Sequence, residues 1–206
     1  MKKKIGILLL FLVIIGLAGF GVYSWNYYSR YIDVDNIYPG VRIQGMDVGG
    51  LSLEEAQQKV EDYLDELSEK TVTLQVGEKE KSFTFRQMGL RCVNEDATRE
   101  AEKLGREGNI IKRVLEVQAL AVRGKDIPLE FTTDADKTKK IVKKKGRSLE
   151  TKKKNAQLTR KDGKFVIKDE VDGISIEFGA NAQKLTELIE SPDWDQQDVQ
   201  VAMDYE

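Results

Sequence analysis

The side chains with potential for chemistry in this chain of 206 residues are carboxylates, lysines, arginines and a single thiol. The chain has no histidine, which removes Ser-His-Asp and Cys-His catalysis, histidine zinc sites and a histidine proton switch near neutral pH. Cys92 therefore has no histidine to activate it, and a single cysteine forms no disulfide within the chain. Because its neighbours Leu90 and Val93 are apolar, we expect Cys92 to be a buried structural residue.

Other motifs of catalytic or ion-binding sites are also missing from the sequence. It contains no Ser-x-x-Lys and no Gly-Lys-Ser/Thr phosphate loop. It has no calcium loop either, because Asp33 and Asp35 are followed by Ile37 where a calcium site needs an oxygen ligand. Carboxylates are abundant, but abundance alone does not indicate the paired acids of a glycosidase. We predict that the protein is not an enzyme and has no catalytic residues, no metal site and no cofactor.

A strongly basic segment is the first candidate binding site. Residues 137–168 include 14 Lys and Arg against two acidic residues, whereas residues 169–206 include 11 acidic residues against one basic residue. A basic segment attracts polyanions, and in a domain that faces a cell wall these are teichoic-acid phosphates and peptide-stem carboxylates. We name Lys143, Lys144 and Lys145 as candidate ligand contacts. The alternative is a solvated helix and loop that balance the acidic flanks.

The same segment argues against nucleic acid as the partner. Between residues 137 and 164 no aromatic residue stands among the lysines. Proteins that bind single strands stack the bases on aromatic rings. We therefore predict no nucleic-acid partner.

The turn at residues 105–109, Gly-Arg-Glu-Gly-Asn, is the second candidate site. Gly105 and Gly108 permit positive φ at a helix break, and Asn109 can cap the helix that follows. Arg106 offers a fork of donors suited to carboxylates or phosphates. We therefore name Arg106 and Asn109 as further candidate ligand contacts. The alternative is a corner between helices, in which Arg106 binds a backbone carbonyl or an acid of its own domain.

The start of the chain predicts a membrane anchor. Residues 5–25 are almost wholly apolar, and as a helix they span roughly 31 Å, the thickness of the hydrocarbon layer of a bilayer. Three lysines at 2–4 precede this run and an aromatic cluster follows it. We predict a cytoplasmic basic tip at 1–4, a single-pass signal anchor at 5–28 in the cell membrane, in contact with the lipid bilayer, and an extracellular body. The alternative is a cleaved signal peptide, although its apolar region normally runs only about 7–15 residues.

Hydrophobic periodicity predicts the elements that position these candidates. Strands are expected at 41–43, 72–76, 83–85, 127–131 and 199–203, with a hairpin at 158–167. Helices are expected at 53–68, after a cap at Asn94, from 110 to 117, after a cap at Thr133, and from Asn181 onward. Ser52 and Glu55 form a capping box for the first helix.

The order of these elements predicts an α+β fold. In it, the transmembrane helix is followed by two small mixed lobes with antiparallel hairpins. We place the first lobe of the extracellular module at 33–124 and the second at 125–206.

Three stretches of the sequence resemble a known family. They are YPGVRIQGMDVGGLSLEEA at 38–56, GREGN at 105–109, and DGKFVI at 162–167 with VDG at 171–173. The chain from residue 33 onward is similar to the peptidoglycan-binding module of YoaR type. In Gram-positive bacteria such modules follow a membrane anchor, ahead of L,D-transpeptidase domains or within VanW-type proteins. The resemblance implies a wall-associated module whose ligand is peptidoglycan, and it assigns no residue to ligand contacts.

The leading prediction is thus a membrane-anchored extracellular module that binds or scaffolds peptidoglycan and has no catalytic activity of its own. Catalysis by the transpeptidases associated with that family needs a His and a Ser-x-Gly-Cys motif, and this sequence has neither. Two alternatives stay open. One is a truncated, non-catalytic amino-terminal part of an L,D-transpeptidase that acts with a separate L,D-transpeptidase as partner. The other is an extracellular protein-interaction or regulatory module.

Overall fold

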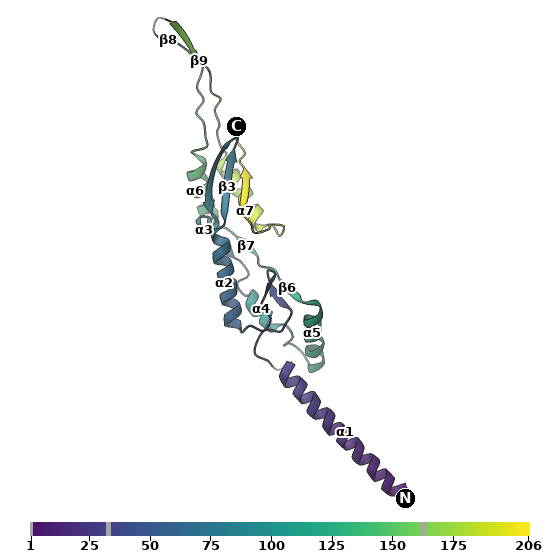
Figure 1. Ribbon diagram of the computed structural model, residues 1–206. Coiled ribbons are helices and arrows are strands. Elements are labelled where there is room, and N and C mark those ends of the chain that lie inside the picture. Colours follow the sequence, from purple (N-terminus) through teal and green to yellow (C-terminus); the bar gives the residue numbers. More distant parts are fainter. Residues whose placement is uncertain (1, 32–33, 162–163) are drawn as a thin grey trace. The chain divides into compact units, whose positions relative to one another are not determined.

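The computed structural model describes residues 2–31, 34–161 and 164–206, with side chains described at 12–26, 34–160 and 165–206. The chain divides into two compact units, and each unit draws on two separate stretches of sequence (Figure 1). Unit 1 comprises residues 1–59 and 96–128, and unit 2 comprises residues 60–95 and 129–206. This division differs from the two consecutive lobes expected from the sequence, because strands distant in sequence pair within each unit.

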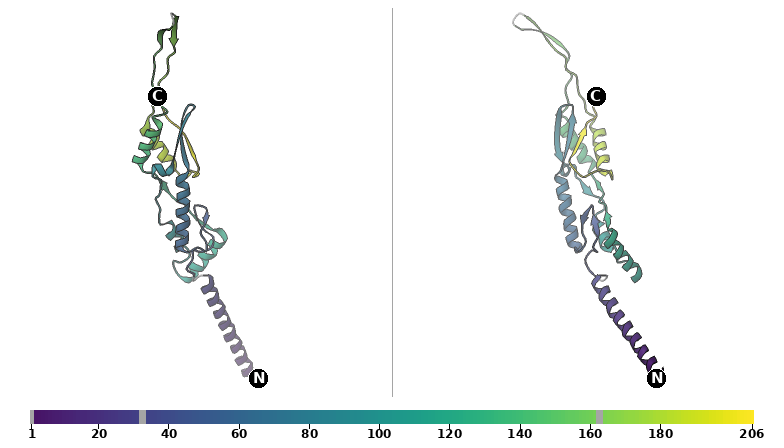
Figure 2. Two further views of the ribbon diagram at one scale, coloured as in Figure 1. Left: turned by 60° about the vertical axis from the view of Figure 1, so that its left-hand side comes forward. Right: turned by 45° about the vertical axis from the view of Figure 1, so that its right-hand side comes forward.

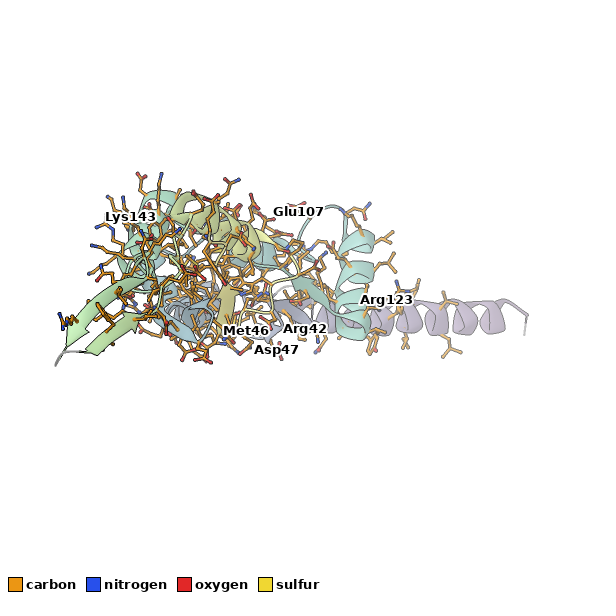
Figure 3. The ribbon with its side chains drawn as sticks, turned by 90° about the horizontal axis from the view of Figure 1, so that it is seen from above. Arg42, Met46, Asp47, Glu107, Arg123 and Lys143 are labelled. Atoms are coloured by element: carbon orange, nitrogen blue, oxygen red, sulfur yellow. The ribbon has the colours of Figure 1, made fainter. Side chains whose placement is uncertain are left out.

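Unit 1 contains a small sheet with the strand order β2-β1-β6. β1 (Val41–Ile43) pairs antiparallel with β2 (Met46–Asp47) and parallel with β6 (Lys125–Ile127). Val41 and Ile43 are fully buried, which confirms the alternating strand predicted here. Arg42, the exposed residue between them, is labelled in Figure 3 together with Met46 and Asp47 of β2. Unit 1 also contains α4 (Ala97–Lys103), which packs on β1, and α5 (Ile110–Arg123), which leads into β6.

The first helix, α1 (Lys2–Tyr31), is 30 residues long (Figures 1 and 2). The side chains of the predicted anchor at 5–11 and 27–28 lie outside the described residues. The large apolar side chains described between Leu12 and Trp25 are 53–72% exposed. Within the part of the chain that the structure describes, no helix has the length and apolar character needed to cross a membrane.

Unit 2 contains a second sheet with the order β10-β3-β4. β3 (Thr71–Val76) pairs antiparallel with β4 (Lys79–Thr84) and parallel with β10 (Val199–Ala202). Every second residue of β3, from Val72 to Val76, is buried, as the predicted strand requires. The hairpin of β3 and β4 is therefore confirmed, although Phe85 begins a helix and does not extend the strand.

The helix α2 (Leu53–Glu69) precedes β3, and the boundary between the two units falls inside it. Its predicted capping box is confirmed. The Ser52 N–H donates to Glu55 Oε2 at 2.8 Å, and the Glu55 N–H donates to Ser52 Oγ at 3.2 Å. These bonds satisfy donors that the first turn of a helix leaves unpaired, and the first one lowers the pKa of Glu55.

Two helices, α6 (Ala135–Gly146) and α7 (Phe178–Glu190), pack against each other in unit 2. Gly146 permits this approach, because a Cβ there would lie 2.7 Å from Phe178 Cε1. α6 also contacts β4 and the short helix α3 (Phe85–Met88). Nearby in the same unit, Trp194 meets Phe85 and Phe131 edge-on, with ring centroids 5.2 and 5.5 Å apart. Such edge-to-face packing makes the core of this unit partly aromatic.

A hairpin of β8 (Gln157–Lys161) and β9 (Lys164–Lys168) forms a separate two-stranded sheet in unit 2 (Figure 2). Isolated bridges join Thr151 with Ile174 and Lys154 with Val171 on the way to it. We call residues 151–174 the arm. The predicted hairpin is confirmed, and its turn at 162–163 lies outside the described residues.

The single strand predicted at 127–131 is wrong. β6 ends at Ile127, and β7 (Phe131–Thr132) begins after Pro128, which has no N–H to offer a sheet. β6 pairs with β1 in unit 1, whereas β7 pairs with β5 (Arg91–Cys92) in unit 2. The alternating apolar residues at 127, 129 and 131 therefore do not belong to one strand, because the chain passes from unit 1 to unit 2 between them.

Two predicted helix caps are wrong by one or two positions. The cap of α4 is Asp96 in place of Asn94, and the cap of α6 is Asp134 in place of Thr133. Both replaced residues have tertiary partners. Asn94 Oδ1 accepts the N–H of Glu130 at 2.8 Å, and Thr133 Oγ1 lies 3.0 Å from Thr186 Oγ1.

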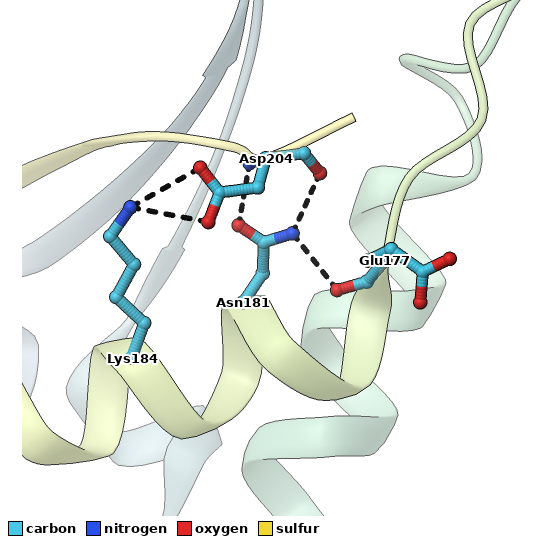
Figure 4. A network of polar contacts seen from close by, with 4 residues as sticks. All are labelled: Glu177, Asn181, Lys184 and Asp204. Atoms are coloured by element: carbon cyan, nitrogen blue, oxygen red, sulfur yellow. Dashed lines mark hydrogen bonds and ion pairs between the residues drawn. The ribbon is translucent and has the colours of Figure 1, made fainter. Parts of the chain in front are cut away.

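Asn181 lies inside α7, not at its start, and ties the helix to the end of the chain (Figure 4). Its side chain, 2% exposed, donates from Nδ2 to the carbonyls of Glu177 and Asp204, both at 2.9 Å. Its Oδ1 accepts the N–H of Asp204 at 2.8 Å, and Lys184 Nζ lies 3.3 Å from both carboxylate oxygens of Asp204. A buried amide with these partners is well satisfied, so Asn181 holds the segment after β10 against α7.

Candidate functional site

The basic surface on α6 is created by the way the helix packs. Thr138, Val142 and Gly146 recur every fourth residue and are buried against the core of unit 2. This spacing keeps one face of a helix inward and turns the positions between toward solvent. The side chains of Lys139, Lys140, Lys143 and Lys144 are exposed as a result.

The three lysines named from the sequence are not equivalent. Lys143 and Lys144 are exposed, and Figure 3 labels Lys143 on the outer side of its helix. Lys145 is half-buried. Among the described side chains these three form no ion pair, whereas Lys137 lies 3.9 Å from the capping carboxylate of Asp134. We call Lys139, Lys140, Lys143 and Lys144 the α6 lysine face.

Sequence reasoning missed Lys139 and Lys140 as members of this surface. The signal that identifies them is the helical spacing of Thr138 and Val142, which places the lysines at 139, 140, 143 and 144 together on the opposite side. The run of three consecutive lysines at 143–145 attracts attention in the sequence, but three consecutive residues span about 200° around a helix, so Lys145 turns toward the buried side.

A second basic surface lies at the base of the arm. Lys152, Lys153 and Lys154 are exposed. A shallow depression adjoins them, and Thr151, Lys153, Asp172, Gly173, Ile174, Ser175 and Glu206 line it. Its lining combines one cationic side chain with two carboxylates, so these charges partly offset one another.

Arg106 lies in unit 1, and the structure places its guanidinium among carbonyls of that unit. Nη1 donates to the carbonyl of Glu102 at 2.7 Å. Nη2 donates to three successive carbonyls, those of residues 34, 35 and 36, at 3.0, 2.7 and 2.9 Å. The guanidinium also lies 5.5 Å from the ring centroid of Tyr38, within the range of a cation–π contact. We call these contacts the Arg106 clamp.

The turn around Arg106 has the backbone predicted for it. Gly105 and Gly108 have φ of 75° and 94°, and Asn109 Oδ1 accepts the N–H of Lys112 at 2.9 Å as the cap of α5. Gly105 also allows close packing, because a Cβ there would lie 2.8 Å from the Tyr38 ring and 2.9 Å from Val117. These contacts match the corner between helices that the sequence left open as the alternative. Arg106 and Asn109 as ligand contacts stay a prediction.

Cys92 is 8% exposed, as the sequence predicted for a structural residue. Its Sγ lies 3.2 Å from Asn94 Oδ1, and burial raises the pKa of the thiol. A thiol that stays protonated near neutral pH is a poor nucleophile. Among the residues that the structure describes, no cluster of acidic or cysteine side chains could hold a metal ion.

The comparison with protein families identifies the family to which the chain belongs. The model of the family described as "Putative peptidoglycan binding domain" matches residues 82–195. This span is more than half of the chain, and the protein belongs to that family. No curated protein and no solved structure matches the chain. The matched span contains the α6 lysine face, the arm and Arg106 itself, whereas residues 34–38 of the Arg106 clamp precede it.

Proposed function

We propose that the protein is a membrane-anchored, non-catalytic module of YoaR type that binds peptidoglycan on the outer side of the cell membrane. The observation that supports it is the family match over residues 82–195. Peptidoglycan and the polymers attached to it present carboxylates and phosphates, and the α6 lysine face lies within the matched span. This face is the surface proposed to meet the wall.

The proposal assigns the α6 lysine face an electrostatic role. Exposed cations on one helix face raise the local concentration of a polyanion and add modest contact energy, about 0.3–0.7 kcal/mol for each exposed pair. Such contacts weaken with salt, because the Debye length falls to about 8 Å at physiological ionic strength. Wall binding is therefore expected to decline as salt rises.

The anchoring part of the proposal rests on the sequence of α1. Residues 5–28 contain no charged residue and follow three lysines. Positive charge at the amino-terminal side of an apolar helix favours a cytoplasmic amino terminus. In this orientation, the chain that follows α1 lies on the side of the cell wall.

Sedimentation of the full chain with isolated sacculi in mild detergent tests wall binding. Replacing Lys140, Lys143 and Lys144, three members of the α6 lysine face, by Gln removes three exposed charges and is expected to weaken binding roughly fivefold to thirtyfold, with a flatter salt dependence. The matched control replaces Lys81, Lys103 and Lys125, which are exposed outside α6, and is expected to bind like the wild type. Equal losses in the two variants would assign the effect to net charge. A wild-type chain that stays in the supernatant at low salt would refute the proposed function.

A further inference from the structure

One face of α5 is apolar and open to solvent. Ile111, Leu115 and Val122 are 69%, 61% and 83% exposed. Their spacing of four and seven residues places them in one stripe along the helix. The opposite side of the helix faces the core of unit 1, and Leu120 on that side is 5% exposed. α5 therefore has its most exposed apolar residues on the side that faces away from the core.

Cationic side chains border this stripe. Lys112 and Arg123 are both exposed, and Arg123, the last residue of α5, is labelled in Figure 3. At the start of the helix a shallow depression is lined by Asn109, Ile111, Lys112, Leu115 and Glu116. An apolar stripe with basic residues on its flank is typical of a helix that lies in a membrane interface, because the cations reach the headgroups while the stripe enters the acyl boundary.

The Arg106 clamp limits how far the turn at residues 105–109 can move from the end of α1. α1 ends at Tyr31, and the clamp fixes the carbonyls of residues 34, 35 and 36 to Arg106, in the turn before α5. From residue 31 to residue 34 an extended chain spans at most about 11 Å. Ile37 and Tyr38, each 1% exposed, anchor the next residues in the core of unit 1.

The covalent order also places α5 close to the clamp. Asn109 caps α5 and stands three residues after Arg106. If α1 is inserted in a bilayer, the clamp holds the first turn of α5 near the surface of that bilayer. Such tethering raises the effective concentration of lipid at the stripe, so even a weak affinity is sufficient for binding.

We infer that α5 is a second membrane contact, which lies in the interface of the outer leaflet and inserts Ile111, Leu115 and Val122 between the headgroups. The inference rests on the anchoring part of the proposed function. It commits to a lipid surface as the occupant, and anionic headgroups pair with Lys112 and Arg123. Anchored in this way, unit 1 lies against the membrane.

The test uses the full chain reconstituted in vesicles of phosphatidylglycerol and phosphatidylcholine. An environment-sensitive fluorophore is attached at Leu115→Cys or Val122→Cys in a Cys92→Ala background, and the control label is at Lys103→Cys, an exposed site on α4. Brominated lipids are expected to remove about half of the emission at 115 and 122, because interfacial helices insert about 5–10 Å deep. They are expected to leave the label at 103 unchanged. Ile111→Glu is expected to abolish quenching at 122 while the circular dichroism spectrum stays the same.

The outcomes separate this inference from the proposed function. If α1 resists extraction by carbonate but aqueous iodide, not brominated lipid, quenches the label at 115, the inference is wrong and the anchor stands. If neither agent quenches that label, a second copy or another protein covers the stripe, which also overturns the inference. If carbonate extracts the protein, both the anchor and the inference fail. Sacculus binding is independent of all three results.

Discussion

Replacing Arg106 by Ala is the most informative single change, because its two candidate roles predict opposite results. As a ligand contact, Arg106 would matter for wall binding and little for stability. As the centre of the clamp, it would matter for the stability of unit 1. The structure gives its guanidinium four backbone carbonyls at 2.7–3.0 Å.

The magnitude follows from these bonds. A hydrogen bond that involves a charged group contributes about 1.5–3 kcal/mol. Four such bonds do not add, because they share one side chain that is 23% exposed and water can reach part of the vacated site. The contact with the Tyr38 ring adds about 0.5–1 kcal/mol, and the ion pair with Glu102 at 3.8 Å adds little. We expect Arg106→Ala to lower the free energy of unfolding of unit 1 by about 2–4 kcal/mol.

Hydrogen exchange of the full chain measures this loss locally. Backbone amides at 36–38 and 102–113 are expected to exchange faster in Arg106→Ala than in the wild type. Amides around Trp194, in unit 2, are expected to exchange at the wild-type rate. Arg106→Lys keeps the charge but not the planar fork, so it should recover less than half of the loss. The reasoning is refuted if the Ala variant exchanges like the wild type. If that variant also fails to sediment with sacculi, Arg106 is a ligand contact.

Three further predictions concern the fold. Gly40→Ala should prevent folding or cost more than about 4 kcal/mol in urea unfolding, since its Cβ would lie 2.1 Å from the Leu120 carbonyl oxygen at φ 89°. The control for this change is Gly45→Ala, at φ 74° with open space around it, which should cost only about 1–2 kcal/mol. The Thr71 N–H donates to Asp198 at 2.6 Å and lowers the pKa of that carboxyl. The free energy that this hydrogen bond contributes to folding is present above the unfolded pKa of about 4 and is lost as pH falls through the folded value. The loss of stability caused by Asp198→Asn, measured by urea unfolding at several acidic pH values, should therefore become smaller as pH falls. Burial raises the pKa of Cys92, so a thiol reagent at about pH 8 should label it quickly only in urea. Rapid labelling of the folded chain would contradict the buried site.

Local signals in the sequence were sufficient for much of the secondary structure. The capping box of Ser52 and Glu55 and the cap at Asn109 form as predicted, because each needs only a partner three residues away. The hairpins of β3 with β4 and β8 with β9 were also predictable, since short turns connect neighbouring strands. These features depend on interactions between residues that are close in the sequence.

Long-range pairing is what the sequence did not reveal. β1 pairs in parallel with β6 and β3 with β10, across separations that periodicity does not measure. Asn94 and Asn181 have the residue type of a cap, but their side chains bond to Glu130 and Asp204, which are distant in sequence. Tertiary partners therefore decide the role of a short polar side chain where several are available.

For the candidate site, too, the sequence indicated the residue types and only the fold indicated their neighbours. Composition identified the basic segment, but the buried face of α6 decides which lysines are together. The type of residue suggested a ligand role for Arg106, and only the fold reveals the carbonyls that surround it. The exposed stripe on α5 gave no sequence signal, because its apolar residues have the helical spacing that normally indicates a core.

The family match and the folding units cover different parts of the chain, and the difference bears on function. The match begins at residue 82 and ends at residue 195. In unit 1, β6 lies within this span, but its partner β1 precedes it. In unit 2, β4 begins just before the span and pairs with β3, which in turn pairs with β10 after the span. Both three-stranded sheets thus need strands from outside the matched residues. Unit 2, which contains the α6 lysine face, therefore needs β3 and β10 from outside the matched residues, and unit 1, which contains the exposed stripe of α5, needs β1.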